Sequence, residues 1–235
     1  VYRRLPWGRL AQLHLLDDRQ YRALQACRKP GATNAGGVRP ADCAELADPT
    51  RSLLGPAQEQ WLDAGLAADA KNDHTRWSVL AQQTLFSPRR YPSGQVAADG
   101  WDGYPAARER LLQSVQRHSP RNTVLLGGDI HQNYVCNVHA PGADGDRPVL
   151  ASEFCGTSIS SRAGTTQDKV DAIARHNPHV LLARCEERGY GLADITPEQW
   201  TTTLRAVDNP LDPHSSAHTL ARFVVQDRKP GPVRA

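Results

Sequence analysis

Several residue types and patterns are scarce in this chain of 235 residues, and each shortage excludes a class of protein. Methionine is absent, so the chain has no initiator residue, and we expect that a segment precedes Val1. Only four of the 28 basic residues are lysines, and the formal net charge is +3. So small an excess gives no argument for nucleic-acid binding. No apolar run approaches the roughly 20 residues of a membrane-spanning helix, and no signal peptide is visible.

The composition is that of a globular protein. Hydrophobic residues make up 39% of the chain and charged residues 23%, which is typical of a folded, water-exposed domain rather than a disordered segment. The length suits one large domain or two small ones. We find no internal repeat and no low-complexity tract, so repeat architectures are excluded.

The five cysteines include no C-x-x-C pair, which argues against a zinc knuckle built from thiolates. Cys27 and Cys43 bracket a loop rich in glycine, proline and polar residues, which would gain about 3 kcal/mol from a closing disulfide. We therefore expect this pair to be a disulfide formed in an oxidising compartment, with two free thiols as the alternative. Cys136 and Cys155 lie in apolar runs and are expected in the core.

The hydrophobic pattern predicts strands that alternate with helices and then dominate the chain. Helices are expected from Pro56 onward and over residues 104–119 and 169–176. The final residues 228–232 are expected to be a tail, and residues 88–103 an exposed loop. Together these segments indicate a layered α/β fold whose sheet becomes antiparallel toward its end. Strands are expected over residues 7–17, 77–84, 123–126, 133–139, 149–154, 189–195 and 218–226, with a turn over residues 141–146 and another short element starting at residues 197–200.

One segment combines two metal-binding side chains with a rigid support. An apolar run ends at Gly127 and Gly128, which are followed by Asp129 and His131. Residues i and i+2 of a strand point to the same side, and the two glycines permit a sharp turn and close approach. A carboxylate and an imidazole side by side at the end of a buried strand are typical metal ligands.

Eight short segments in order resemble the alkaline phosphatase D (PhoD-like) family of metallophosphoesterases. Because several motifs match in series, the resemblance is far more specific than any one of them. The match extends over nearly the whole chain. It is carried by residues 7–8, 16–22, 54–62, 101–105, 128–131, 152–154, 177–179 and 188–190.

The resemblance implies a fold, an activity and a location. The fold would be a calcineurin-like sandwich of two mixed sheets flanked by helices, here incomplete at its N-terminus. The activity would be hydrolysis of phosphate monoesters or diesters by metal-activated water, with Ca²⁺ and Fe³⁺ as cofactors. The protein would be secreted or periplasmic. Asp129 and His131 inherit the role of metal ligands, and His131 is also a candidate catalytic residue near the leaving group.

The chain also departs from the family pattern. The family's cysteine ligand and its Gly-Asp-x-x-Tyr and Asp-Asp-His-Glu segments do not occur, and Asp17 and Asp18 are followed by Arg19. We therefore expect residues 1–235 to be the C-terminal portion of a single PhoD-like domain. One aspartate and one histidine cannot fill the coordination spheres of two or three ions, because Ca²⁺ alone takes roughly six to eight ligands.

Three further residues are candidate substrate-binding groups, and two of them also have a structural alternative. Asp102 would lie at the mouth of the site or cap the helix that starts near Pro105. Arg19 would face a phosphate or pair with Asp17 or Asp18. Asn133 is a candidate because it lies two residues beyond His131.

A second class of function is a truncated, non-catalytic remnant that serves as a binding or structural module. The missing upstream ligands support this reading, whereas an unused buried pair of Asp129 and His131 would be costly to keep desolvated. A nuclease-type relative of the same fold has little support, since basic and aromatic residues are not interleaved.

Overall fold

The computed structural model describes residues 1–72, 75–142 and 147–235. The largest unit is a seven-stranded mixed sheet, whose strands β2, β4, β6 and β8 are parallel to one another. β1, β7 and β9 run antiparallel to their neighbours. In spatial order the strands are β1 (Arg3–Trp7), β2 (Ala11–Leu15), β4 (Trp77–Ala81), β6 (Thr123–Gly127), β8 (Val149–Cys155), β7 (Asn133–His139) and β9 (Val180–Arg184).

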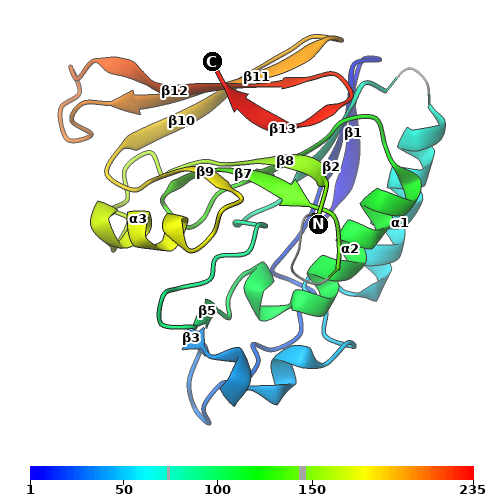
Figure 1. Ribbon diagram of the computed structural model, residues 1–235, viewed down its shortest axis with the longest axis vertical. Coiled ribbons are helices and arrows are strands. Elements are labelled where there is room, and N and C mark those ends of the chain that lie inside the picture. The colour runs from blue at the N-terminus through cyan, green and yellow to red at the C-terminus, as the bar shows by residue number, and fades with distance from the viewer. Residues whose placement is uncertain (73–74, 143–146) are drawn as a thin grey trace.

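Two helices cover one face of this sheet, α1 (Pro56–Lys71) and α2 (Pro105–His118) (Figure 1). Both begin at a proline, whose missing N–H is harmless in the first turn of a helix. Leu66 of α1 and Leu111 of α2 pack with Leu80 and Leu125 of the sheet in one core. The predictions of these two helices are confirmed, as is the third helix, α3 (Gln167–Arg175), which packs against β9.

A second, four-stranded sheet packs on the opposite face of the large sheet (Figure 1). Val79 and Val124 point toward it because successive residues of a strand face opposite sides of a sheet. They meet Trp200 and Phe223 in a second core. Its strands in order are β10 (Arg188–Ile195), β11 (Gln199–Val207), β12 (Ala217–Gln226) and β13 (Lys229–Arg234).

The sandwich of two sheets flanked by helices agrees with the expected architecture, with three corrections. The second sheet is antiparallel throughout its described strands, not mixed. The expected tail is strand β13, because Val233 pairs with Val224 at the edge of the second sheet. The expected single strand over residues 7–17 is instead part of the hairpin of β1 and β2, which turns at Gly8 with φ of 56°.

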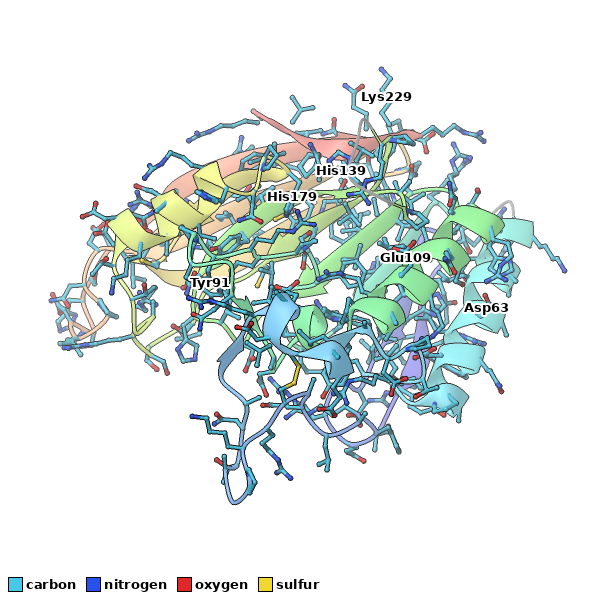
Figure 2. All side chains as sticks on the ribbon, turned by 60° about the horizontal axis from the view of Figure 1, so that its bottom comes forward. Asp63, Tyr91, Glu109, His139, His179 and Lys229 are labelled. Atoms are coloured by element: carbon cyan, nitrogen blue, oxygen red, sulfur yellow. A yellow bond between two sulfur atoms is a disulfide. The ribbon has the colours of Figure 1, made fainter. Side chains whose placement is uncertain are left out.

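A small lobe lies below the large sheet (Figure 1), and the disulfide between Cys27 and Cys43 closes it, as predicted. The yellow sulfur–sulfur bond is visible in Figure 2. The lobe contains two short 3₁₀ helices, η1 (Pro40–Asp42) and η2 (Ala44–Ala47), and the two-residue strands β3 (Gly37–Val38) and β5 (Val96–Ala97). Ala26, Leu46 and Val96 form its own apolar core.

The expected exposed loop over residues 88–103 is a structured segment. It contains β5 and the 3₁₀ helix η3 (Trp101–Gly103), and the side chain of Trp101 is buried against Phe86. Cys136 and Cys155 are buried free thiols, as predicted. The expected turn over residues 141–146 falls partly outside the described residues. None of the described helices is long and apolar enough to cross a membrane.

Candidate metal centre

The candidate site lies where the parallel strands of the large sheet end. β2, β4, β6 and β8 run in the same direction, so the segments after their C-terminal ends meet at one edge. Ligands of α/β proteins commonly bind outside this carboxyl edge. The residues two positions beyond the ends of these four strands are, in order, Asp17, Gln83, Asp129 and Thr157.

The backbone around Asp129 is a turn and not the strand that the i, i+2 argument assumed. β6 ends at Gly127, and Asp129 and His131 both have positive φ, of 69° and 57°. Non-glycine residues seldom adopt this conformation, and such strain clusters at functional sites. The close approach predicted for the glycines is found at Gly127, where a Cβ atom would lie 2.2 Å from the carbonyl oxygen of Thr84.

Asp129 is exposed and forms an ion pair with Arg19. Its side chain is 46% exposed, and its Oδ2 accepts a hydrogen bond of 2.8 Å from Nη2 of Arg19. The expectation of a buried pair is therefore wrong, because the Asp129 carboxylate is exposed and His131 is only partly buried. Because Asp129 is exposed, the desolvation argument against a non-catalytic role does not apply to it.

One ring nitrogen of His131 forms a hydrogen bond that fixes the orientation of the imidazole. Its Nδ1 lies 2.9 Å from the carbonyl oxygen of Arg162. A carbonyl oxygen can only accept, so Nδ1 must carry the proton of the neutral ring, and Nε2 then has a free lone pair. This is the arrangement of metal-bound histidines, whose other nitrogen usually donates to a carbonyl or carboxylate.

Arg19 does not pair with Asp17 or Asp18 through its side chain. Its guanidinium bridges Asp99, at 2.7 Å, and Asp129. Asp17 instead accepts the backbone N–H of Arg19, and Asp18 accepts that of Gln83. The expected pairing of Arg19 with Asp17 or Asp18 is therefore wrong, because the fold brings the carboxylates of Asp99 and Asp129 to its guanidinium instead.

Two aspartates near Arg19 have shifted pKa values. Burial raises the pKa of Asp18 to about 6, since its side chain is buried beneath the site. Partial burial alone would raise the pKa of Asp99, but hydrogen bonds and charges from Arg19 and Arg22 lower it below its ordinary value. Asp99 also accepts a hydrogen bond from Gln25, so it links the small lobe to the site.

Asp102 lies at the site and does not cap α2. Its Oδ2 accepts the backbone N–H of Arg89, and its Oδ1 accepts from Nη1 of Arg108 at 2.6 Å. The capping alternative is wrong, because these contacts occupy both oxygens and Tyr104 precedes the helix without a side-chain cap. A cavity of about 220 Å³ is lined by Asp102 together with Asp99, Asp129 and Arg89.

Asn133, the third candidate substrate contact, is buried at the start of β7. Its Oδ1 accepts the backbone N–H of Thr157 at 3.1 Å and so supports the loop that follows β8. The sequence reasoning did not single out Asp99 or Arg89 as site residues. Neither lies in a recognisable motif, and only the tertiary structure brings them to the same cavity.

The residues present fit a metal site in part. The orientation of His131 and the exposed Asp129 carboxylate are suitable for two ligands of a hard or borderline cation. Within residues 1–72, 75–142 and 147–235, however, no group of three or more His, Cys, Asp or Glu side chains is placed to hold an ion. The described chain therefore offers two donors and not a complete coordination sphere.

Comparison with known proteins shows that the chain matches part of the length of longer relatives. The chain is 35% identical to "Alkaline phosphatase D" of Bacillus subtilis (strain 168), with 98% of this chain and 38% of that protein aligned. Its fold matches a solved structure titled "Structure of PhoD" with a TM-score of 0.86 and 34% identity, over 100% of this chain and 43% of that one. It thus spans about two fifths of the length of these relatives. The family model described as PhoD-like phosphatase matches residues 1–204, and the chain belongs to this family.

Proposed function

We propose that this chain contributes metal ligands and substrate-facing groups to a metal-dependent phosphoesterase of the PhoD-like type. The observation that carries the proposal is the joint placement of Asp129 and His131 at the carboxyl edge of the parallel strands. The hydrogen bond from His131 Nδ1 to Arg162 O supports it, because it leaves Nε2 free to ligate. The proposed substrates are phosphate monoesters or diesters.

Ca²⁺ and Fe³⁺, the ions that the family resemblance implies, would neutralise phosphate charge and acidify water at such a centre. Asp129 and His131 would hold them from this chain. Arg19 and Arg89 supply positive charge beside the cavity, where they can orient phosphate oxygens. His131 is also proposed to assist the leaving group, and the contact of Asp102 or Asn133 with substrate remains a proposal.

We further propose that residues 1–235 are the C-terminal portion of a single domain in a longer, secreted or periplasmic protein. The two-donor site and the relatives' greater length support this, and the Cys27–Cys43 disulfide supports an oxidising location. Sequencing the DNA upstream of the Val1 codon tests it. Gly-Asp-x-x-Tyr and Asp-Asp-His-Glu segments in frame are expected, and a start codon immediately before Val1 would contradict the proposal.

The test of function uses the longest in-frame protein that contains this chain. Asp129→Ala should lose bound metal, measured by elemental analysis, and most hydrolysis of p-nitrophenyl phosphate and bis(p-nitrophenyl) phosphate. Asp208→Ala is a matched control, since Asp208 is an exposed aspartate that pairs with His218 and Ser216 away from the site. Full activity with full metal content in Asp129→Ala would refute the site assignment.

A non-catalytic binding or structural module is the second candidate. It is favoured by the Arg19–Asp129 ion pair, which satisfies the carboxylate without a metal. Calorimetric titration of the longest protein with Ca²⁺ separates the two functions. Binding that Asp129→Ala abolishes supports the enzyme, and no binding at millimolar Ca²⁺ supports the module.

A further inference from the structure

A buried arginine connects the segments that surround His131. Arg188 is the first residue of β10, and only 6% of its surface is exposed. Such burial is unusual for arginine unless the charge is paired. No carboxylate lies within ion-pair distance of Arg188 in the described part of the chain. Its neighbours are instead carbonyl and hydroxyl oxygens.

Those oxygens belong to three different segments. Nη1 donates to the carbonyl oxygen of Ser161 at 2.9 Å and to Oγ of Ser158 at 3.1 Å. The same nitrogen lies 3.3 Å from the carbonyl oxygen of His131, and Nη2 donates to that of Cys185. One guanidinium therefore joins the turn after β6, the loop after β8 and the end of β9.

His131 depends on this junction at two points. Its backbone is in the left-handed region, with φ of 57°, so surrounding contacts must hold it there. Arg188 contacts its carbonyl directly. The imidazole is held by the carbonyl oxygen of Arg162. Arg162 directly follows Ser161, whose carbonyl oxygen accepts the hydrogen bond of 2.9 Å from Arg188.

Only arginine meets the geometry of this junction. Its planar guanidinium presents several donors in fixed directions and stays charged when buried, whereas a lysine offers a single ammonium at the end of a flexible chain. In Arg188→Lys the single ammonium nitrogen could take the place of Nη1 beside His131 and the loop after β8, but it would leave the carbonyl oxygen of Cys185 without its donor.

We propose that Arg188 is a positioning residue that keeps His131 in the orientation with Nδ1 protonated toward Arg162 and Nε2 free. The importance of Arg188 for catalysis rests on the proposed function, in which Nε2 of His131 is a metal ligand. The orientation of the His131 ring is independent of that function, because the contacts that set it involve no metal ion.

The test compares Arg188→Gln and Arg188→Lys with the wild type, each in the longest in-frame protein that contains this chain and freed of metal with a chelator, by long-range ¹H–¹⁵N NMR of the histidine rings at a pH of about 8.5, where imidazole is neutral. The His131 signals are assigned as those missing from His131→Gln. Arg184→Gln is the control, since Arg184 is a neighbouring arginine that pairs with Glu187 and does not contact His131. Circular dichroism checks that each variant is folded.

The wild type and Arg184→Gln should show His131 as the Nδ1–H tautomer. In Arg188→Gln the Nε2–H form should rise several-fold, and Arg188→Lys should give an intermediate ratio. The proposal is overturned if folded Arg188→Gln keeps the wild-type ratio, or if the wild type itself shows Nε2–H. It is also overturned if both variants fail to fold, since Arg188 would then be a general structural residue.

A second readout separates this proposal from the proposed function. Mn²⁺ added to the longest in-frame protein that contains this chain should broaden the His131 ring signals, with roughly 10- to 100-fold weaker binding in its Arg188→Gln variant. If Mn²⁺ leaves the His131 signals of that longer protein unchanged, the ligand role of His131 fails. The tautomer ratios still decide whether Arg188 positions the ring.

Discussion

Nη2 of Arg19 lies 2.8 Å from Oδ2 of Asp129, although 110 positions separate the two residues in the chain. Nη1 of the same guanidinium contacts Asp99, so a single side chain spans the small lobe and the end of β6. A cation that binds Oδ2 of Asp129 must therefore compete with Arg19.

Arg19→Gln should raise the affinity of this chain for Mn²⁺ at Asp129. Removing one positive charge a few ångströms from the ion is worth about 1 kcal/mol at a solvated site, or roughly fivefold in affinity. Titration followed by paramagnetic NMR broadening measures it. Arg22→Gln is the matched control, since Arg22 contacts Asp99 and not Asp129. Equal affinity in both variants would show that Arg19 does not compete with the ion.

Gly127→Ala and Gly128→Ala should differ sharply in stability, although the glycines are adjacent. A Cβ on Gly127 would lie 2.2 Å from the carbonyl oxygen of Thr84, so backbone must move, at a cost of about 2–3 kcal/mol. A Cβ on Gly128 meets only the carbonyl oxygen of Gln83, at an ordinary 3.7 Å. Urea denaturation measures the free energy of unfolding of both, and equal losses would contradict this packing.

Asp227 should stabilise the fold in a way that depends on pH. Hydrogen bonds from Arg121 and Asn122 lower its pKa to about 2, below the ordinary value near 4. Because the folded pKa is depressed, the stabilisation is complete above about pH 5 and is lost as the pH falls toward 2.

Asp227→Asn should therefore lower the free energy of unfolding by about 1–2 kcal/mol at pH 7, a figure reduced for the partial exposure of the ion pair. The difference from wild type should shrink steadily between pH 5 and pH 3 in urea denaturation. A difference that stays constant over this range would mean that the carboxylate charge is not the source of the effect.

Breaking the Cys27–Cys43 disulfide should cost about 3 kcal/mol, because the bond closes a loop over 16 positions and restricts the unfolded chain. Thermal unfolding with and without a reductant measures the loss. The double variant Cys27→Ser, Cys43→Ser should unfold at the same temperature as the reduced wild type, and adding the reductant should not change that temperature. A wild type that is insensitive to reduction would contradict the stabilising role.

Local sequence patterns predicted most of the elements. The apolar runs around Val79 and Val124 are buried on both faces, so they stand out whatever packs against them. Strand β13 was missed because Pro230 and Gly231 are typical of a tail and the strand forms only along the edge offered by β12. Strand β9 was missed too, because it is an edge strand that pairs with β7 alone.

The sequence by itself determined the layered α/β class and predicted the pairing of Cys27 with Cys43, and its motif resemblance indicated the family, the sandwich fold and the two candidate ligands. These depend on periodicity and on short motifs, which are local properties of the chain. Only the tertiary structure decided that Arg19 faces Asp129 and that Arg188 contacts the carbonyl oxygen of His131. Such contacts join distant segments, and they follow from the strand order that brings the carboxyl ends of β2, β4, β6 and β8 to one edge.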